Sequence, residues 1–270
     1  MNIKLACGSW QNRRMTRTGV NRTAVVTGAS SGIGAATARR LAEAGYRVVL
    51  TGRRGDRLAE VAEQIAAEGG QAEVHRLDVT DRPAVDELAR SLDRCDVLVA
   101  NAGGAVGADT VAASSAADWL AMYEVNVLGT LNCVQALLPK LIASGDAAIV
   151  IMGSTAGFTA YEGGGGYVAA KHGEHAIAAT LRLELYDQPV RVIEIAPGMV
   201  KTAEFAVNRF RGDADKAAAV YAGVEEPLTD MDVADAVTWA VTRPAHFNVD
   251  LMVLRPRAQA AQHKVHRVTP

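Results

Sequence analysis

The side chains best placed to do chemistry are Tyr167 and Lys171, which lie four residues apart in the segment YVAAK. In a helix this spacing puts both side chains on one face. We expect the lysine ammonium to favour the phenolate and to lower the pKa of the tyrosine toward neutral pH. Such a tyrosine can take a proton from an alcohol or return one to a carbonyl. We therefore predict that Tyr167 is the proton-transfer residue of an oxidoreductase.

Two further polar residues fit the same chemistry. Ser154 lies thirteen residues before Tyr167, at the end of an apolar run, where its hydroxyl can orient the oxygen of a substrate. Asn126 lies inside a helical pattern, where asparagine is mildly unfavourable. We predict a functional reason for it, and an exposed helical asparagine is the alternative. The predicted catalytic residues are Asn126, Ser154, Tyr167 and Lys171. Tyr167 and Lys171 are also predicted cofactor contacts, because the lysine ammonium can hydrogen-bond ribose hydroxyls and hold the nicotinamide in place.

A glycine-rich segment, TGASSGIG at 27–34, follows an apolar run and opens a helical pattern. Glycines let backbone N–H groups approach a pyrophosphate, and the N-terminus of a helix favours an anion. The segment predicts a dinucleotide site, and a plain glycine turn is the alternative. The predicted contacts are Gly28, Ser30, Ser31, Gly32, Ile33 and Gly34.

Two arginines, Arg53 and Arg54, follow the second apolar run. A site specific for NAD usually has an acidic residue here, which accepts the ribose 2′-hydroxyl. Arginines instead attract a 2′-phosphate and can contact it through two N–H groups. We therefore predict NADP(H) as the cofactor. Solvated residues at the start of a helix are the alternative.

Residues after the third and fourth apolar runs complete the predicted cofactor groove. The carboxylate of Asp78 can accept from the adenine amine, with the N–H of Val79 nearby, although a turn or helix-cap role is the alternative. The segment NAGG begins at 101, and its small residues let the backbone line a groove at the carboxyl ends of the strands. The contacts expected there are Asn101, Ala102 and Gly103.

These residues sit between short apolar runs and longer helical patterns that alternate along the chain. The expected strands are 23–27, 47–51, 74–77, 96–100, 147–153, 191–196 and 249–254. The expected helices are 32–44, a helix ending near 68, 117–143 and 167–186. Right-handed crossovers then predict an α/β protein. It is a single-domain Rossmann fold whose doubly wound parallel sheet has about seven strands and helices on both faces.

The domain prediction follows from where this alternation holds. We expect a flexible extension over 1–20, with Met15 as an alternative start, and a dinucleotide-binding and catalytic domain over 21–256. A substrate lid is expected over about 203–225, where the alternation breaks. The tail over 257–270 is polar and is expected to end loosely.

Composition excludes several classes of protein. The 270 residues carry a net charge of −2, which argues against a nucleic-acid partner or an anionic membrane surface. No run approaches the roughly 18 apolar residues of a membrane span. Three cysteines without CxxC spacing indicate reduced thiols, hence a cytoplasmic location, and no metal site is predicted.

Taken in order, these motifs resemble the short-chain dehydrogenase/reductase family. The similarity covers about 22–256 and rests on TGASSGIG, LDV, NAG, EVNVLG, GSTAG, YVAAK and APGMVKT. The resemblance implies a catalytic tetrad at the four positions predicted above, with Asn126 supporting a water that leads protons to the lysine. It also implies that the nicotinamide end is wrapped by Pro197, Gly198, Val200 and Thr202.

A narrower likeness covers PGMVKTAEFAVNRFRGDADKAAAVY and the segment that ends in VDLMVLRP. These stretches are similar to NADP-dependent 3-hydroxy acid dehydrogenases that act on serine and allo-threonine. The likeness implies a small hydroxy acid as substrate, with Arg209 or Arg211 holding its carboxylate; solvated lid arginines are the alternative. It also implies a homotetramer or dimer packed through the helices 117–143 and 167–186.

Two alternatives and two departures remain. A carbonyl reductase for a bulkier specialised-metabolite intermediate is the alternative enzyme, and a non-catalytic NADP(H)-binding regulator is the alternative class. Ala100 stands where the family usually has a second asparagine before Ala-Gly, which could loosen a strand-end hydrogen bond. The four glycines at 163–166 suggest a small wall beside Tyr167 and a wider pocket.

Overall fold

The computed structural model describes residues 22–268, so the extension predicted over 1–20 lies outside the described residues. Seven parallel strands form the central sheet in the order β3-β2-β1-β4-β5-β6-β7. They are β1 Thr23–Thr27, β2 Arg47–Gly52, β3 Gln71–Arg76, β4 Val97–Ala100, β5 Ala147–Met152, β6 Val190–Pro197 and β7 Leu251–Leu254. The predicted fold class is confirmed. The third strand begins and ends earlier than expected. Its residues are exposed or only partly buried, so its short apolar run did not mark its bounds.

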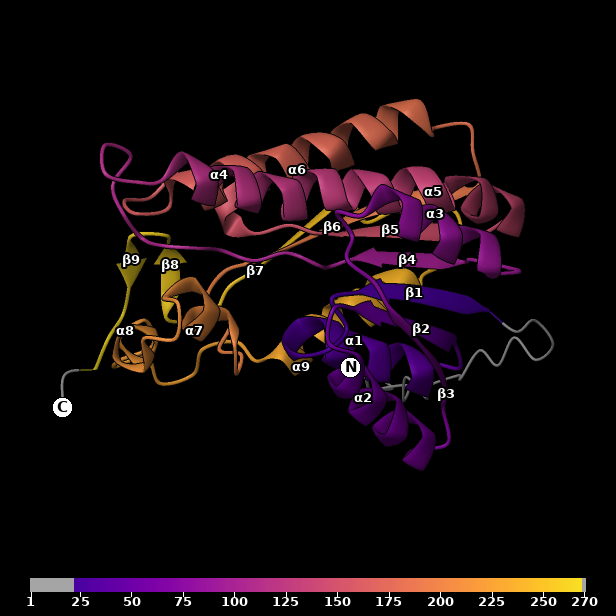
Figure 1. Ribbon diagram of the computed structural model, residues 1–270, viewed down its shortest axis with the longest axis horizontal. Helices are drawn as coiled ribbons and strands as arrows, with labels where there is room; N and C mark the ends of the chain where they lie inside the picture. Colours follow the sequence, from indigo (N-terminus) through magenta and orange to yellow (C-terminus); the bar gives the residue numbers. More distant parts are fainter. Residues whose placement is uncertain (1–21, 269–270) are drawn as a thin grey trace, which may run out of the picture.

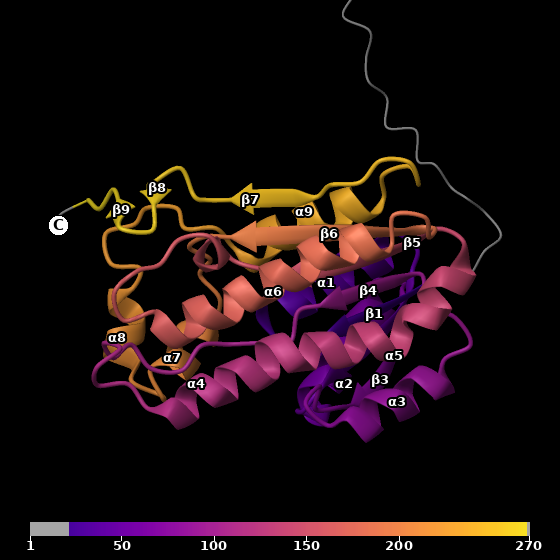
Figure 2. The ribbon, with the colours of Figure 1, turned by 90° about the horizontal axis from the view of Figure 1, so that it is seen from above.

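Helices cover both faces of this sheet, as Figure 1 and Figure 2 show. One face carries α3 Arg82–Ser91, α4 Ala116–Tyr123, α5 Gly129–Ser144 and α6 Gly165–Glu184. The other carries α1 Gly32–Glu43, α2 Gly55–Ala67 and α9 Asp230–Val241. The sequence patterns did not predict α3 and α9. Each begins at a side-chain cap, from Asp81 and Thr229 respectively, which satisfies free N–H groups of the first turn.

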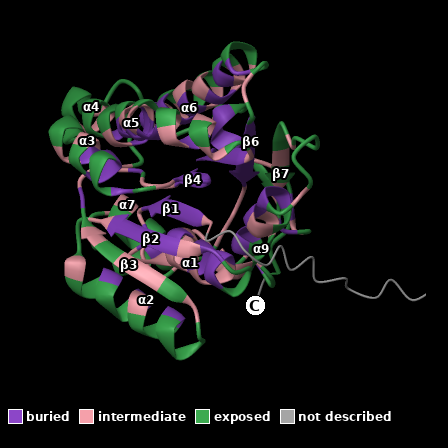
Figure 3. Ribbon diagram, turned by 90° about the vertical axis from the view of Figure 1, so that its right-hand side faces the viewer, coloured by how far each residue is buried: buried purple, intermediate pink, exposed green. Residues whose placement is uncertain are grey.

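Two apolar cores form where the helices meet the sheet. Leu41, Ile65 and Val237 pack on one face, and Leu88 and Leu137 pack on the other. The central strands are buried on both faces, whereas the outer faces of the helices are exposed (Figure 3). This explains why the strands read as continuous apolar runs rather than alternating ones.

The helix from Ala116 to Ser144 is continuous, with a π-helical turn, η1 Glu124–Leu128, between α4 and α5. An 18-residue window of it reaches a mean hydropathy of 1.3, so by length and composition alone it could cross a membrane. In the fold, Cys133, Val134 and Leu141 on its inner face belong to the apolar core. Packing against the sheet therefore accounts for part of its apolar character.

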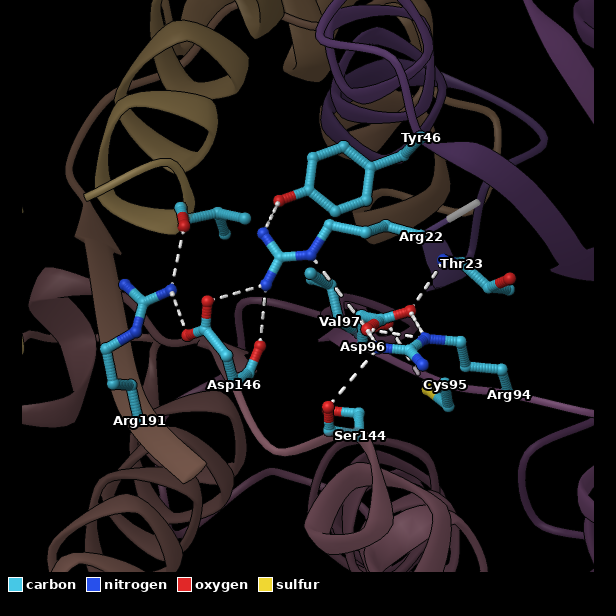
Figure 4. A network of polar contacts seen from close by, with 11 residues as sticks. Arg22, Thr23, Tyr46, Arg94, Cys95, Asp96, Val97, Ser144, Asp146 and Arg191 are labelled. Atoms are coloured by element: carbon cyan, nitrogen blue, oxygen red, sulfur yellow. Dashed lines mark hydrogen bonds and ion pairs between the residues drawn. The ribbon is translucent and has the colours of Figure 1, made fainter. Parts of the chain in front are cut away.

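A network of charged groups ties the elements together at the amino ends of the strands (Figure 4). Asp96, which is fully buried, accepts from the backbone N–H of Thr23 at 2.8 Å and pairs with Arg94 at 2.6 Å. Arg22 pairs with Asp146 at 2.8 Å. These contacts join β1, β4 and the turn before β5 at the end of the sheet opposite the predicted site.

The predicted lid and the C-terminal segment both lie beyond the carboxyl ends of the strands, at the left of Figure 1. The lid carries the short helices α7 Phe205–Arg209 and α8 Ala214–Ala219. We had expected the tail to end loosely, but up to residue 268 it is ordered. It forms the hairpin β8 Gln259–Ala261 and β9 Lys264–Val265, and the backbones of Val268 and Gly223 share a hydrogen bond.

Candidate active site

Tyr167 and Lys171 lie on one face of α6, as their spacing predicts, and both line the same cavity. The ammonium of Lys171 lies 5.7 Å from the centre of the Tyr167 ring. It also donates to the carbonyl of Met152, at the end of β5, at 2.8 Å. The β5 strand and α6 together therefore fix the position of this charge beneath the tyrosine.

We expected the pKa of Tyr167 to be lowered, but in the structure it is raised. The surrounding protein raises the pKa of the phenol through burial, and this outweighs the lowering by Lys171. The carboxylate of Glu174 raises it further, while a hydrogen bond with the Ser154 hydroxyl lowers it. The expectation considered only the lysine, and it missed a second charge on the same helix.

Ser154 follows β5 and caps the short 3₁₀ turn η2 Thr155–Gly157 by accepting from the N–H of Ala156 at 3.1 Å. Its hydroxyl also lies 3.3 Å from the carbonyl of Pro197 at the end of β6. It is buried and lines the cavity beside Tyr167. The structure thus brings this residue next to the tyrosine, as predicted.

Asn126 lies in the π-helical turn η1 and is fully buried, which excludes the exposed alternative. Its side-chain amide donates to the carbonyls of Met122 and Gly104 at 2.7 and 3.0 Å, and its oxygen accepts from the N–H of Gly104 at 3.1 Å. Asn126 therefore holds the loop after β4 in place. It is not among the described residues that line the cavity. Such π-helical turns often occur at functional sites.

The glycine loop between β1 and α1 is packed against the end of β4. A Cβ at Gly34 would lie 2.3 Å from the carbonyl oxygen of Gly28, so no larger residue fits there. Gly28 itself has a positive φ of 66°. The side chain of Asn101 donates to the carbonyl of Thr27 at 2.9 Å and ties the loop to β4. Close backbone packing of this kind fits a pyrophosphate at the start of α1.

Arg54 lies at the start of α2 and reaches across to this loop. Its guanidinium donates to the hydroxyls of Ser30 and Ser31, both at 2.9 Å, and to the carboxylate of Glu204 at 2.8 Å. Ser31 also donates to Glu204 at 2.8 Å. Arg54 and Ser31 thus already donate to an anionic group, the carboxylate of Glu204. The same donors suit a phosphate. Arg53 is exposed. Burial raises the pKa of Asp78, but hydrogen bonds from Thr80 and, to a smaller extent, the charge of Arg53 lower it below its usual value.

Asp78 stabilises a turn, which is the alternative role given for it above. One carboxylate oxygen accepts from the backbone N–H and the hydroxyl of Thr80, at 3.0 and 2.8 Å. Asp78 and Val79 are not among the residues that line the main cavity, nor are Ser30, Arg53 and Arg54. Ser30 belongs to the glycine loop itself, whereas the other four follow β2 and β3 at the edge of the sheet.

The end of β6 and the segment after it line the cavity through all four residues that the family resemblance implies, Pro197, Gly198, Val200 and Thr202. Sequence reasoning missed the C-terminal residues that hold it. The side-chain oxygen of Gln259 accepts from the N–H of Met199 at 2.8 Å, and Gln262 accepts from the hydroxyl of Thr155 at the same distance. Both glutamines line the cavity, and no local pattern in the tail signals these long-range contacts.

The four glycines before Tyr167 do not widen the pocket. A Cβ at Gly164 would lie 2.5 Å from the ring of Tyr161, and one at Gly165 would lie 2.7 Å from the ring of Trp119. The absent side chains make room for these aromatic rings. The expectation of a wider pocket at this wall is therefore wrong.

The two lid arginines have different surroundings. Arg209 lines the cavity and donates to the hydroxyl of Tyr161 at 3.1 Å and to the carbonyls of Gly107 and Gly163. Arg211 pairs with Asp118 at 2.6 Å, and 65% of its side chain is exposed. Of the two candidates for a substrate carboxylate, only Arg209 lies at the cavity.

These parts meet in one cavity of about 410 Å³ at the carboxyl ends of the strands. It runs from the glycine loop past Tyr167 and Lys171 to the lid. No cluster of His, Cys, Asp and Glu suited to a metal occurs within 22–268. A glycine loop, a serine and a tyrosine–lysine pair around one cavity of a doubly wound sheet define an oxidoreductase of the Rossmann fold.

Comparison with known proteins gives the family. The family model described as short chain dehydrogenase matches residues 22–211. An uncharacterized oxidoreductase of Mycobacterium tuberculosis is 54% identical over 240 residues, which cover 89% of this chain and 93% of the relative. The chain belongs to the short-chain dehydrogenase family and is an oxidoreductase.

Two further relatives have named activities. The NADP-dependent 3-hydroxy acid dehydrogenase YdfG of Escherichia coli (strain K12) is 37% identical over 248 residues, which cover 90% of this chain and 98% of that protein. The closed form of serine dehydrogenase complexed with NADP+ superposes with a TM-score of 0.84 at 36% identity, covering 91% of this chain and 100% of the other. The comparisons therefore find the same group of proteins, the NADP-dependent 3-hydroxy acid dehydrogenases, that the narrower likeness in the sequence indicated.

Proposed function

We propose that this protein is an NADP(H)-dependent dehydrogenase/reductase that transfers a hydride between the nicotinamide and a small hydroxy or carbonyl compound. The observation that carries the proposal is the single cavity that holds the glycine loop at one end and Tyr167 beside Ser154 and Lys171 at the other. The bound nicotinamide would supply the hydride acceptor or donor. The chain's own residues position the substrate oxygen and move its proton.

Each proposed catalytic residue has a distinct role. Tyr167 takes the proton of a hydroxyl substrate, or returns one to a carbonyl, through its phenolic oxygen. Ser154 orients the substrate oxygen with its hydroxyl, and the ammonium of Lys171 favours the phenolate. Asn126 acts on the loop after β4 through its contacts with Gly104 and is a positioning residue in this proposal.

The preference for NADP(H) over NAD(H) rests on Arg54 and Arg53 after β2. Arg54 already coordinates hydroxyls of the glycine loop, at 2.9 Å, and carries a charge that favours a 2′-phosphate. Arg53 adds a second positive charge at the same edge. Asp78 and Val79 are proposed contacts of the adenine, with Asn101, Ala102 and Gly103 along the groove.

We propose a small 3-hydroxy acid as the substrate class. Support comes from the relative named for this activity and from Arg209, a cation at the cavity whose guanidinium can face a carboxylate. The glycine run no longer favours the alternative, a bulky specialised-metabolite carbonyl, because aromatic rings fill the space beside it. That alternative, and a non-catalytic regulator, are therefore outcomes of the experiment rather than parts of the proposal.

A homo-oligomer, a dimer or a tetramer, is proposed to form through α4–α5 and α6. Large apolar side chains remain exposed there, including Leu183 on α6 at 77% and Tyr186, just after the end of α6, at 85%. Apolar area of this kind on the outer faces of neighbouring helices suits a second copy of the chain. Light scattering from the purified protein tests this, and a monomer would reject it.

A cytoplasmic location is also proposed, because Cys95 and Cys133 are buried free thiols. Burial raises the pKa of both thiols to about 12, which makes them inert. Fractionation of cells that express the protein tests the location, and recovery outside the cytoplasm would reject it.

Titration of the purified protein with NADPH and NADH, followed by nicotinamide absorbance, tests the function. The hydroxy acids L-serine, L-allo-threonine and 3-hydroxypropionate are assayed with NADP+ or NAD+ as the hydride acceptor. A few aldehydes, and bulky ketones for comparison, are assayed with NADPH or NADH as the hydride donor. We expect tighter binding of NADPH and turnover of the hydroxy acids. Binding of NADPH with turnover of bulky ketones alone would reject the substrate class, and binding without any turnover would favour the regulator.

A further inference from the structure

A buried carboxylate that the tetrad does not include lies against the catalytic lysine. Glu174 is three residues after Lys171 on α6, and its carboxylate is 2.6 Å from the ammonium. The exposed fraction is 1% for the Glu174 side chain and 6% for that of Lys171. The contact is therefore an ion pair between two side chains that are almost fully removed from water.

Burial makes this contact consequential for the reaction. Removing an ammonium from water disfavours its charged form, and only the charged form of Lys171 favours the Tyr167 phenolate. Burial alone would lower the pKa of Lys171, but Glu174 is the largest influence that raises it, and the net direction is upward. The lysine therefore keeps its proton because a carboxylate is beside it.

The neighbouring charged groups single out Glu174 for this role. Glu194 on β6 also raises the pKa of Lys171, but its own carboxylate pairs with His175 at 2.9 Å and with Arg182 at 3.7 Å. Within 22–268, Lys171 is the cation at ion-pair distance from Glu174. From α5, the hydroxyl of Thr130 hydrogen-bonds the carboxyl group of Glu174.

We propose that Glu174 is a positioning residue that holds the buried Lys171 ammonium charged and in place beneath Tyr167. This inference rests on the proposed function. The same carboxylate raises the pKa of Tyr167, so it also opposes phenolate formation. Burial and Glu194 raise the pKa of Glu174 itself to about 7, so this balance changes near neutral pH.

The test is Glu174→Gln, which removes the charge and keeps the shape. We expect the alkaline limb of kcat/KM for alcohol oxidation to move to lower pH by about one unit, since an adjacent opposite charge shifts a pKa by roughly 1–3 units. At acid pH the profiles should converge, because Glu174 is then protonated. Glu174→Asp, with a retracted carboxylate, should shift less. Asp96→Asn is the matched control, a buried carboxylate at the far end of the sheet, and it should leave the profile in place.

A second readout does not require turnover. Heteronuclear NMR of lysine-labelled, cofactor-free protein measures the pH at which Lys171 loses its proton, with the signal assigned through Lys171→Met. We expect a lower pH in Glu174→Gln and an intermediate value in Glu174→Asp. An unchanged titration of Lys171 in both variants would overturn the proposal, as would a rate loss equal at every pH. If the wild type turned over no substrate, the NMR result would still decide the role of Glu174 while the proposed function failed separately.

Discussion

Replacing Arg54 with alanine should selectively weaken the binding of NADPH. Arg54 is the arginine that reaches the glycine loop, through Ser30 and Ser31, and it stands where a 2′-phosphate would lie in the proposed site. NADH lacks that phosphate. The variant should therefore lose affinity for NADPH and keep its affinity for NADH.

The magnitude follows from the exposure of Arg54. A charged hydrogen bond contributes about 1.5–3 kcal/mol when shielded, but exposed ion pairs contribute only about 0.2–1 kcal/mol. The Arg54 side chain is 43% exposed, and it exchanges a contact with Glu204 for the phosphate. An intermediate loss of about 1–2 kcal/mol corresponds to roughly 5- to 30-fold weaker binding.

Isothermal titration calorimetry with both cofactors measures this effect. Arg57→Ala is the control, because Arg57 lies on the same helix and pairs with Glu60 rather than with the loop. It removes one positive charge without touching the proposed phosphate contact. Equal losses for NADPH and NADH in Arg54→Ala, or an equal loss of NADPH affinity in Arg57→Ala, would refute the reasoning.

Three further variants test other parts of the account. Glu204→Gln should tighten NADPH binding by about threefold, since it removes a carboxylate that competes for Arg54; calorimetry should show this, and weaker binding would contradict it. Asp96→Asn should lower the free energy of unfolding by about 2 kcal/mol in urea titrations without changing kcat, because it breaks a buried charge network remote from the cavity; an altered kcat would show that the two ends are coupled. Arg209→Ala should raise KM about tenfold for hydroxy acids but not for uncharged aldehydes, with the exposed Arg211→Ala as control; equal effects on both substrate types would argue against a carboxylate contact.

Local patterns in the sequence predict the fold and much of the site because the chemistry lies at strand ends. Each strand of a parallel sheet is a buried apolar run, and the residues that follow it converge at one edge. This is why Gly34, Ser154 and Thr202, far apart in the chain, line one cavity. The spacing of Tyr167 and Lys171 works in the same way, since both belong to one helix.

The parts that the sequence did not predict depend on contacts between distant segments. Gln259 binds the backbone of Met199 across 60 residues, and nothing in the polar tail signals this. Glu204 reaches Arg54 across 150 residues. Glu174 is different, because its i,i+3 spacing from Lys171 is visible in the sequence. The sequence does not show that Glu174 is buried. Its burial is what makes this helical pair important for keeping Lys171 protonated in our proposal.

Turnover of the Tyr167→Phe variant tests the central claim most directly. This change removes the phenolic oxygen and keeps the ring, which packs against Phe205 with 5.8 Å between ring centres. The account predicts that kcat falls by about 10²–10⁴-fold, the usual contribution of a general acid–base group, while NADPH binds with unchanged affinity. Unchanged turnover in a variant that still binds NADPH would contradict the assignment of Tyr167 as the proton-transfer residue.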